Sequence, residues 1–167
     1  MHRYTTWNGP MPTTAAQASV TTGTAIKTML QISTPSSRQL QPISWGFSIS
    51  SVPSAAGVIE LLQTDVAATV TAAVASGVQP LDPNAPASLV TLGTANTGFS
   101  ASVEGATTAA RVFDVVQIPL TAGATDLTYD YQWMPDERPI IGTSKFLRVR
   151  ATFTTAVNMT CYVTWDE

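Results

Sequence analysis

The sequence predicts an all-β protein, a two-sheet β-sandwich of jelly-roll-like topology with an extended N-terminal arm. Three observations predict this class. Apolar and polar residues alternate with a period of two along several segments, most regularly between residues 110 and 165. Clusters of proline, glycine and serine separate these segments, and no segment has the apolar spacing of a long helix. About eight or nine short strands with turns between them are typical of a sandwich or jelly roll.

Residues 1–19 differ from the rest of the chain because they show no strand periodicity and contain glycine and prolines. We therefore expect an extended arm over residues 1–19 and a β-sandwich domain over residues 20–167. Tyr4 and Trp7 lie in this arm, and large aromatic side chains stabilise a fold only when they are buried. Packing of the arm on its own domain or on a neighbouring subunit is therefore favoured over a dangling, solvated tail.

The next three strands are expected to alternate buried and exposed side chains; they cover residues 26–32, 43–49 and 58–62. In the first of them, Thr28 and Leu30 are expected to share one face. In the second, apolar residues alternate with serine and glycine, which places Trp45 in the core.

The middle of the chain has weaker patterns. Residues 66–75 fit an alanine-rich helix that begins after Asp65, and they also fit a strand; their β-branched residues favour the strand. Prolines predict a loop over residues 77–88, and a short strand is expected at 89–92. Residues 93–105 are rich in glycine, threonine, serine and alanine, which favours a long surface loop.

The last third of the chain is expected to form four strands, at residues 110–118, 127–133, 147–153 and 157–165. A proline-bracketed loop over residues 134–139 follows the second of these. The last two strands are separated by a short turn at 155–156, which predicts a β-hairpin.

The chain has 167 residues, the size of one domain. Folding would bury about 69% of the accessible surface of the unfolded chain and leave a folded surface of roughly 7,900 Å². Only 11% of its residues are charged, against about 25% in an average domain. A charge-poor surface loses little when it is desolvated, which suits broad protein contacts. Threonine-rich β-proteins also have such compositions, so both interpretations remain open.

Several function classes find no support in the sequence. There is no lysine or arginine cluster of the kind that tracks phosphates, so no nucleic-acid partner is expected. The N-terminus has no apolar leader and no apolar run approaches 18 residues, so we expect neither secretion nor a membrane span, but synthesis in a cytoplasm. The single cysteine, Cys161, lies in an alternating apolar pattern and is expected to be a small buried hydrophobe.

Catalytic chemistry is not expected. The only histidine, His2, lies in the predicted arm, so a nucleophile–histidine device would need the arm to fold back. His2 and Cys161 alone supply nitrogen or sulfur ligands, which predicts no metal site and no cofactor. Acidic residues gather near one stretch, where they would form either a calcium site or a solvated loop with local charge pairing beside Arg138; the solvated loop is favoured. These acidic residues are Asp126, Asp130, Asp136 and Glu137.

Aromatic residues are the remaining candidates for binding. Tyr129, Tyr131 and Trp133 fall on one face of an expected strand, where they would form either a sugar-stacking platform or a packing surface. Packing in the core or at an interface is favoured because the strand is otherwise ordinary. The residues that we expect at assembly contacts are Tyr4, Trp7, Tyr131, Trp133 and Arg138.

Four segments resemble small head proteins of tailed bacteriophages, the minor capsid or decoration (cement) proteins: ISWGFSI (43–49), VIELL (58–62), PLDPNAP (80–86) and CYVTWDE (161–167). The resemblance implies a β-sandwich, often a homotrimer, that binds the major capsid protein on the outer surface of the virion. It implies reinforcement of the head against internal DNA pressure and no catalytic residues. The alternative is a carbohydrate- or receptor-binding module of a phage tail or a cell-surface protein.

Overall fold

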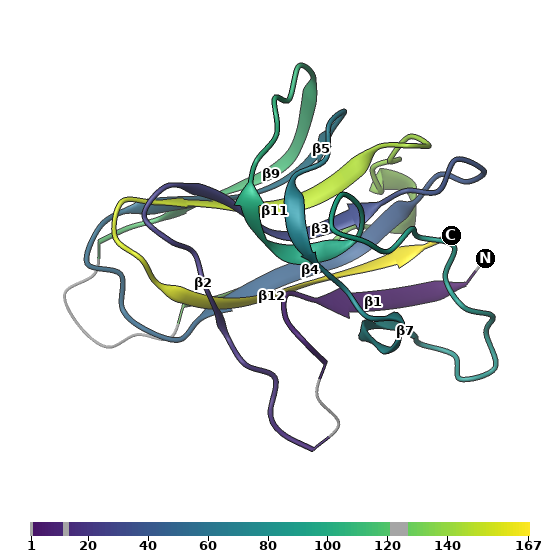
Figure 1. The fold of residues 1–167 in the computed structure, drawn as a ribbon, viewed down its shortest axis with the longest axis horizontal. Coiled ribbons are helices and arrows are strands. Elements are labelled where there is room, and N and C mark those ends of the chain that lie inside the picture. Colours follow the sequence, from purple (N-terminus) through teal and green to yellow (C-terminus); the bar gives the residue numbers. More distant parts are fainter. Residues whose placement is uncertain (1, 12–13, 121–126) are drawn as a thin grey trace.

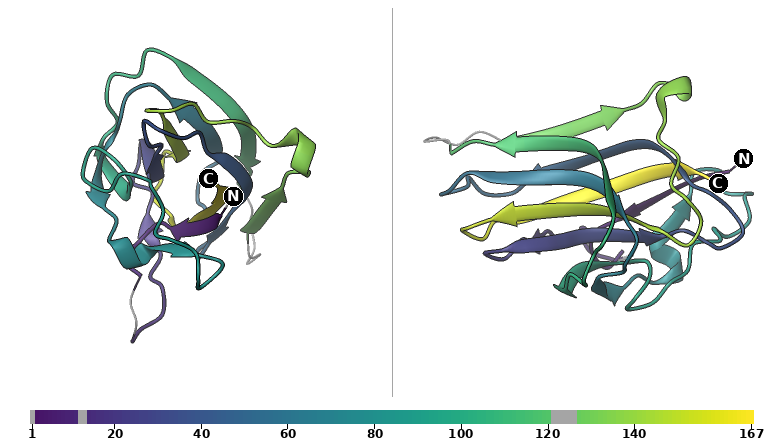
Figure 2. Two further views of the ribbon diagram at one scale, coloured as in Figure 1. Left: turned by 90° about the vertical axis from the view of Figure 1, so that its right-hand side faces the viewer. Right: turned by 90° about the horizontal axis from the view of Figure 1, so that it is seen from above.

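The computed structural model describes residues 2–11, 14–120 and 127–167 and shows a sandwich of two antiparallel sheets (Figure 1). The expected all-β, two-sheet class is confirmed. Helical structure in the described residues is limited to two single turns of 3₁₀ helix, η1 (Ala75–Gly77) and η2 (Pro135–Glu137). Seen end-on, the strands surround one common interior (Figure 2). The folded surface of 7994 Å² is close to that expected from chain length.

One sheet, which we call sheet A, contains both ends of the described chain. Its strands pair in antiparallel fashion in the order β10 (Leu127–Gln132), β4 (Gln41–Ile49), β12 (Asn158–Asp166), β1 (Arg3–Trp7) and β7 (Val78–Pro80). The short strand β2 (Val20–Thr21) pairs with the first two residues of β12, Asn158 and Met159.

The facing sheet, sheet B, consists of strands from all three thirds of the chain. Its order is β6 (Thr69–Ala72), β8 (Gly98–Val103), β3 (Ile26–Ser33), β11 (Phe146–Phe153), β5 (Gly57–Thr64) and β9 (Ala110–Ile118).

The chain changes sheet at most of its connections: from β3 to β4 to β5, and again from β9 to β10 to β11 to β12. The predicted hairpin of the last two strands is therefore wrong. β11 pairs with β3 and β5, whereas β12 pairs with β4 and β1. The turn near residues 155–156 is an arch between the sheets, and both strands bury one face in the same core from opposite sides.

The N-terminal segment is part of the sandwich. The expected arm does not describe Arg3–Trp7, which form β1 between β12 and β7. Tyr4 is 1% exposed, stacks on Trp165 with ring centroids 6.1 Å apart, and donates a hydrogen bond to the Pro86 carbonyl. At the end of β1, the buried Asn8 side chain accepts a hydrogen bond from the Cys161 amide. Packing of this segment on its own domain, one of the two expected arrangements, is what residues 3–8 show.

The core lies between the sheets and contains the residues expected there. Trp45, Cys161 and Trp165 are fully buried. Burial raises the pKa of the Cys161 thiol, which keeps it protonated and unreactive.

In the middle of the chain, residues 69–72 are the strand β6, in agreement with the favoured alternative for this segment. The expected loop over residues 93–105 is wrong, because Gly98–Val103 form β8 between β3 and β6. Residues 91 and 92 make isolated bridges in place of the short strand expected at 89–92.

Residue pairing in β3 also differs from the expectation. Leu30 lies opposite Val149, but the register then shifts by one residue and Thr28 lies opposite Arg150. Thr28 donates its hydroxyl to the Glu104 carboxylate, outside the core. The bulge therefore removes Thr28 from the face that Leu30 occupies.

Candidate functional site

The outer faces of the two sheets differ in how far they are covered. On sheet B, Gln31 and Arg148 are buried beneath the segments that contain Val66, Ala68 and Glu104. Gln31 accepts from the Ala68 amide, and Arg148 donates to the Glu104 carbonyl and to the Val66 carbonyl. This cover lies over the β3–β11 part of sheet B, whereas the outer face of sheet A includes the exposed residues Ser48, Thr128 and Asp130.

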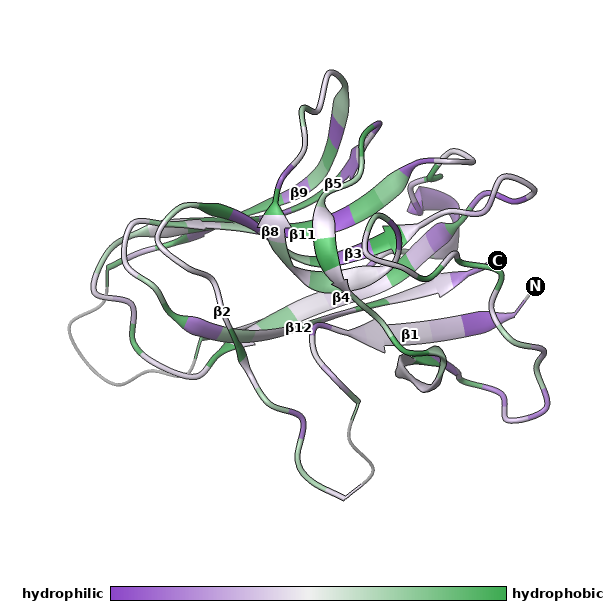
Figure 3. Ribbon diagram, viewed as in Figure 1, coloured by the Kyte–Doolittle hydropathy of each residue, from purple (hydrophilic) through white to green (hydrophobic). Residues whose placement is uncertain are grey.

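The outer face of sheet A carries short hydroxyl side chains. Residues paired across antiparallel strands point to the same side of a sheet, so the register of β10, β4, β12 and β1 determines which residues share this face. Thr5 and Thr164 are hydrogen-bonded to each other there at 3.2 Å. Strand β1 is pale to purple in the hydropathy colouring (Figure 3). The hydroxyl residues on this face are Thr5, Ser44, Ser48, Thr128, Thr160 and Thr164.

Two aromatic rings interrupt this hydroxyl face. Trp7 on β1 lies beside Tyr162 on β12, with ring centroids 4.9 Å apart and planes inclined at 37°. The Tyr162 hydroxyl donates a hydrogen bond of 2.8 Å to Asp130 Oδ1 on β10. Burial, this hydrogen bond and the charge of Asp130 raise the pKa of Tyr162 to about 12, so the phenol remains a neutral donor.

Gly46 lies on β4, the strand between β12, which carries Tyr162, and β10, which carries Asp130. It lies opposite both Tyr162 and Asp130 in the sheet register. A Cβ atom at position 46 would lie 2.8 Å from Tyr162 Cε1 and 2.6 Å from the Tyr129 carbonyl oxygen, and it would overlap Asp130 Oδ1. Only glycine therefore allows the Tyr162 side chain to cross β4 and reach Asp130.

A small hollow of about 130 Å³ opens at this point on the surface, and we call it the Gly46 hollow. Its chemically distinctive groups are the Trp7 and Tyr162 rings and the Asp130 carboxylate. Its lining residues are Trp7, Phe47, Ser48, Thr128, Asp130, Thr160 and Tyr162.

Three of the five residues expected at assembly contacts are largely buried within the chain itself. Tyr4 and Trp133 are both buried, with Trp133 at 7% exposed. Arg138 pairs with Asp166 through a 2.6 Å contact and is itself largely buried, so its charge is used within the domain. These residues stabilise the sandwich.

The other two expected residues lie apart from each other. Trp7 borders the Gly46 hollow, whereas Tyr131 is 40% exposed and packs edge-on against Trp133 at 5.1 Å. Because Trp133 is buried, the alternative of a sugar-stacking platform on this strand would rest on Tyr131 and the half-buried Tyr129.

The expected acidic group does not converge. Asp130 lies on the open face of sheet A, while Asp136 and Glu137 belong to η2 and are exposed to solvent. Asp126 lies outside the described residues. No group of three or more histidine, cysteine, aspartate or glutamate side chains in the described ranges is placed to hold a metal ion.

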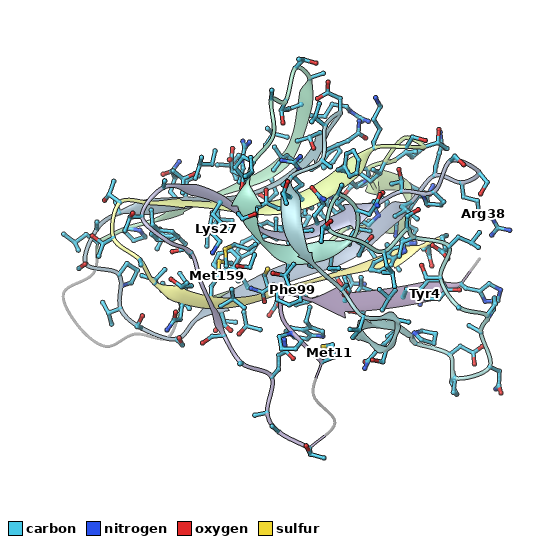
Figure 4. The ribbon with its side chains drawn as sticks, in the orientation of Figure 1. Tyr4, Met11, Lys27, Arg38, Phe99 and Met159 are labelled. Carbon is cyan, nitrogen blue, oxygen red and sulfur yellow. The ribbon has the colours of Figure 1, made fainter. Side chains whose placement is uncertain are left out.

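A second cavity, of about 320 Å³, lies near both ends of the chain and is bordered by His2, Tyr4, Arg38 and Glu167. Tyr4 and Arg38 lie toward this end of the molecule (Figure 4). Glu167 accepts hydrogen bonds from Ser88 and from the Leu89 amide, so its carboxylate anchors a neighbouring loop.

Sequence reasoning missed Tyr162, Asp130 and Gly46 as members of one site. The alternation in β12 and β10 does place Tyr162 and Asp130 opposite the apolar faces of their strands. What the pattern lacked was the strand order, which brings β10, β4 and β12 side by side.

The comparisons with known proteins identify no relative: no family model, curated protein or solved structure matches the chain. Among the described residues, no helix is long and apolar enough to cross a membrane.

Proposed function

We propose that this chain is a structural virion protein that binds the outer surface of a tailed-phage capsid as a homotrimer and stabilises the head. The major capsid protein is its partner in this proposal. The observation that carries it is the open outer face of sheet A, which is rich in hydroxyls and poor in charge. The resemblance of four segments to phage head proteins supplies the partner.

This face suits a broad protein contact for two physical reasons. Burying an unpaired charge costs several kcal/mol, roughly, whereas a hydroxyl finds donors and acceptors easily on a partner surface. Serine and threonine are also short, so less side-chain entropy is lost on burial than with lysine or glutamate. Trp7 and Tyr162 add aromatic area of the kind enriched in interface cores.

Self-association is proposed at β9, the end strand of sheet B. β9 has nine residues and hydrogen-bonds as a ladder with β5 on one side. Val112 and Val115 on this strand are 50% and 48% exposed. An apolar strand at a sheet edge is a ready surface for a neighbouring chain, which supports placing the subunit contact there.

Deletion of residues 2–19 would remove β1 from the interior of sheet A and destabilise the fold. A loss of capsid binding in that variant would therefore not identify the contact surface. A sharper test substitutes one exposed residue on the proposed face, Gln132→Glu, and compares it with the same change in an exposed loop, Gln39→Glu. Heads are purified from a mutant of the parent phage in which the gene for this chain has been deleted. The purified chain is mixed with these heads, and bound protein is measured by sedimentation.

We expect the unmodified chain and Gln39→Glu to bind heads alike. Gln132→Glu should lower the affinity about tenfold or more, since it buries an uncompensated charge. Failure of the unmodified chain to sediment with heads would overturn the proposal, and so would equal binding by the two variants. Binding to a glycan array in place of heads would support the carbohydrate-binding alternative.

A further inference from the structure

The Gly46 hollow combines two groups that attract a cation. The faces of tryptophan and tyrosine rings carry negative electrostatic potential and draw in ammonium and guanidinium groups. Trp7 and Tyr162 supply such rings, and Asp130 supplies a carboxylate at the same opening. No lysine or arginine is among the lining residues, so the hollow has no cation of its own.

The charge of Asp130 is not neutralised within the described part of the chain. The ion pairs found there involve Glu60, Glu104 and Asp166, and not Asp130. The undescribed positions include no lysine or arginine in the sequence. In the described ranges, the one hydrogen bond to the Asp130 side chain is the Tyr162 donation to Oδ1, which leaves Oδ2 for a ligand.

The groups of the hollow are already fixed in position. Tyr162 lies across Gly46 and is held at its hydroxyl by Asp130, and Trp7 is held by the pairing of β1 with β12. A preorganised site avoids much of the entropy cost of ordering side chains on binding.

The size of the hollow limits what enters it. Pockets for whole small ligands measure roughly 300–1,000 Å³, whereas this hollow measures about 130 Å³. A single side chain therefore fits better than a whole cofactor or oligosaccharide. A planar guanidinium can lie against the rings while its N–H groups reach a carboxylate, which the compact ammonium of lysine does less well.

We propose that the Gly46 hollow binds an arginine side chain of a partner protein, with the guanidinium packed on Trp7 and Tyr162 and hydrogen-bonded to Asp130. The partner is defined here by this arginine alone. The hollow lies on the face proposed for the capsid contact, but this proposal rests on the hollow's own groups and stands even if the chain does not bind phage heads.

The indole N–H signals of the protein offer a direct measurement. The chain has four tryptophans, and Trp45, Trp133 and Trp165 are buried, so their signals serve as internal controls. The full chain is titrated in ¹H–¹⁵N spectra with N-acetyl-arginine-amide, with the neutral isostere N-acetyl-citrulline-amide, and with methyl glucoside. Assignment of the Trp7 indole follows from the signal lost in Trp7→Phe.

The arginine derivative should shift the Trp7 indole and the Gly46 amide in a saturable way and leave the three buried indoles in place. The citrulline derivative should bind at least about tenfold more weakly than the arginine derivative, because it lacks the charge that attracts both the rings and the carboxylate. Asp130→Asn should cause a similar loss, whereas Asp136→Asn, the same change at an exposed carboxylate on η2, should not.

Four results would overturn the proposal: no shift at any arginine concentration, equal binding of citrulline, unchanged binding in Asp130→Asn, or stronger binding of methyl glucoside. The last result would identify the hollow as a sugar site. Because these probes contain no capsid, a negative result here leaves the head-binding test unaffected.

Discussion

Asp114 on β9 connects the two sheets. Its Oδ2 atom accepts a 3.1 Å hydrogen bond from the indole nitrogen of Trp45 on β4 and a 2.6 Å hydrogen bond from the hydroxyl of Tyr129 on β10. β9 belongs to sheet B, whereas β4 and β10 belong to sheet A. One carboxylate therefore fastens the sandwich along the side where β9 and β10 end the sheets.

Asp114→Ala should remove both hydrogen bonds. A hydrogen bond to a charged group contributes about 1.5–3 kcal/mol, and Trp45 is fully buried, so its N–H would lose its partner without access to water. Tyr129 is only partly buried and can be hydrated in part. We expect the free energy of unfolding to fall by about 3–5 kcal/mol, which corresponds to a lowering of Tm by about 10 °C.

Urea unfolding followed by tryptophan fluorescence measures this loss, with Asp114→Asn as the control that keeps an acceptor oxygen. In a double-mutant cycle, Asp114→Ala combined with Tyr129→Phe should cost less than the sum of the two single changes. A loss below about 1 kcal/mol, or strict additivity in the cycle, would refute the role assigned to Asp114.

Three further predictions concern other positions. Gly46→Ala should lower the free energy of unfolding by about 1–3 kcal/mol through overlap with its neighbours, and a stability unchanged in urea titration would contradict this. Arg148→Ala should cost about 3–5 kcal/mol, because it leaves the paired Glu104 beside an empty buried site; a thermal melt within about 2 °C of the unmodified chain would argue against it. Hydrogen bonds from Thr108 and the adjacent backbone lower the pKa of Asp65 to about 2, so its contribution to stability is complete above its ordinary pKa of 3.8 and is lost as the pH falls towards 2. The stability difference between the unmodified chain and Asp65→Asn should shrink across that range, and a difference independent of pH would show that the Asp65 charge is unimportant.

The alternation of apolar and polar residues located strands correctly where one face of the strand is mainly apolar and the other mainly polar. The strand predicted at residues 110–118 coincides with β9, and the strand predicted at 147–153 differs from β11 by one residue. Alternation reports which face of a strand is buried and carries no information about its partner. A short turn at 155–156 fits a hairpin within one sheet and an arch between two, and the arch is what forms.

The strands that escaped prediction lack strong side-chain patterns of their own. β8 is a Gly-, Ser- and Ala-containing segment whose order comes from pairing with β3 and β6. At Gly98, an added Cβ would overlap the Thr71 carbonyl, so the glycine that suggested a loop in fact permits close strand contact. β1 has only Tyr4 and Thr6 on its inner face, too few for a periodicity to be seen.

The candidate site depended on the same missing information. Tyr162 and Asp130 are 32 residues apart in the sequence, and each is an ordinary outward-facing residue in its own strand. They meet only because β4 lies between β10 and β12 and carries a glycine at position 46. Residue type alone therefore favoured Tyr4 and Trp133, which the sandwich buries.

Cryo-electron microscopy of gene-deleted heads to which the purified chain has been added tests the central proposal most directly. The proposal predicts trimeric density on the outer surface of the shell, with the β10–β4–β12–β1 face turned towards the major capsid protein. Heads without added density, or density in which this face points to solvent, would contradict it.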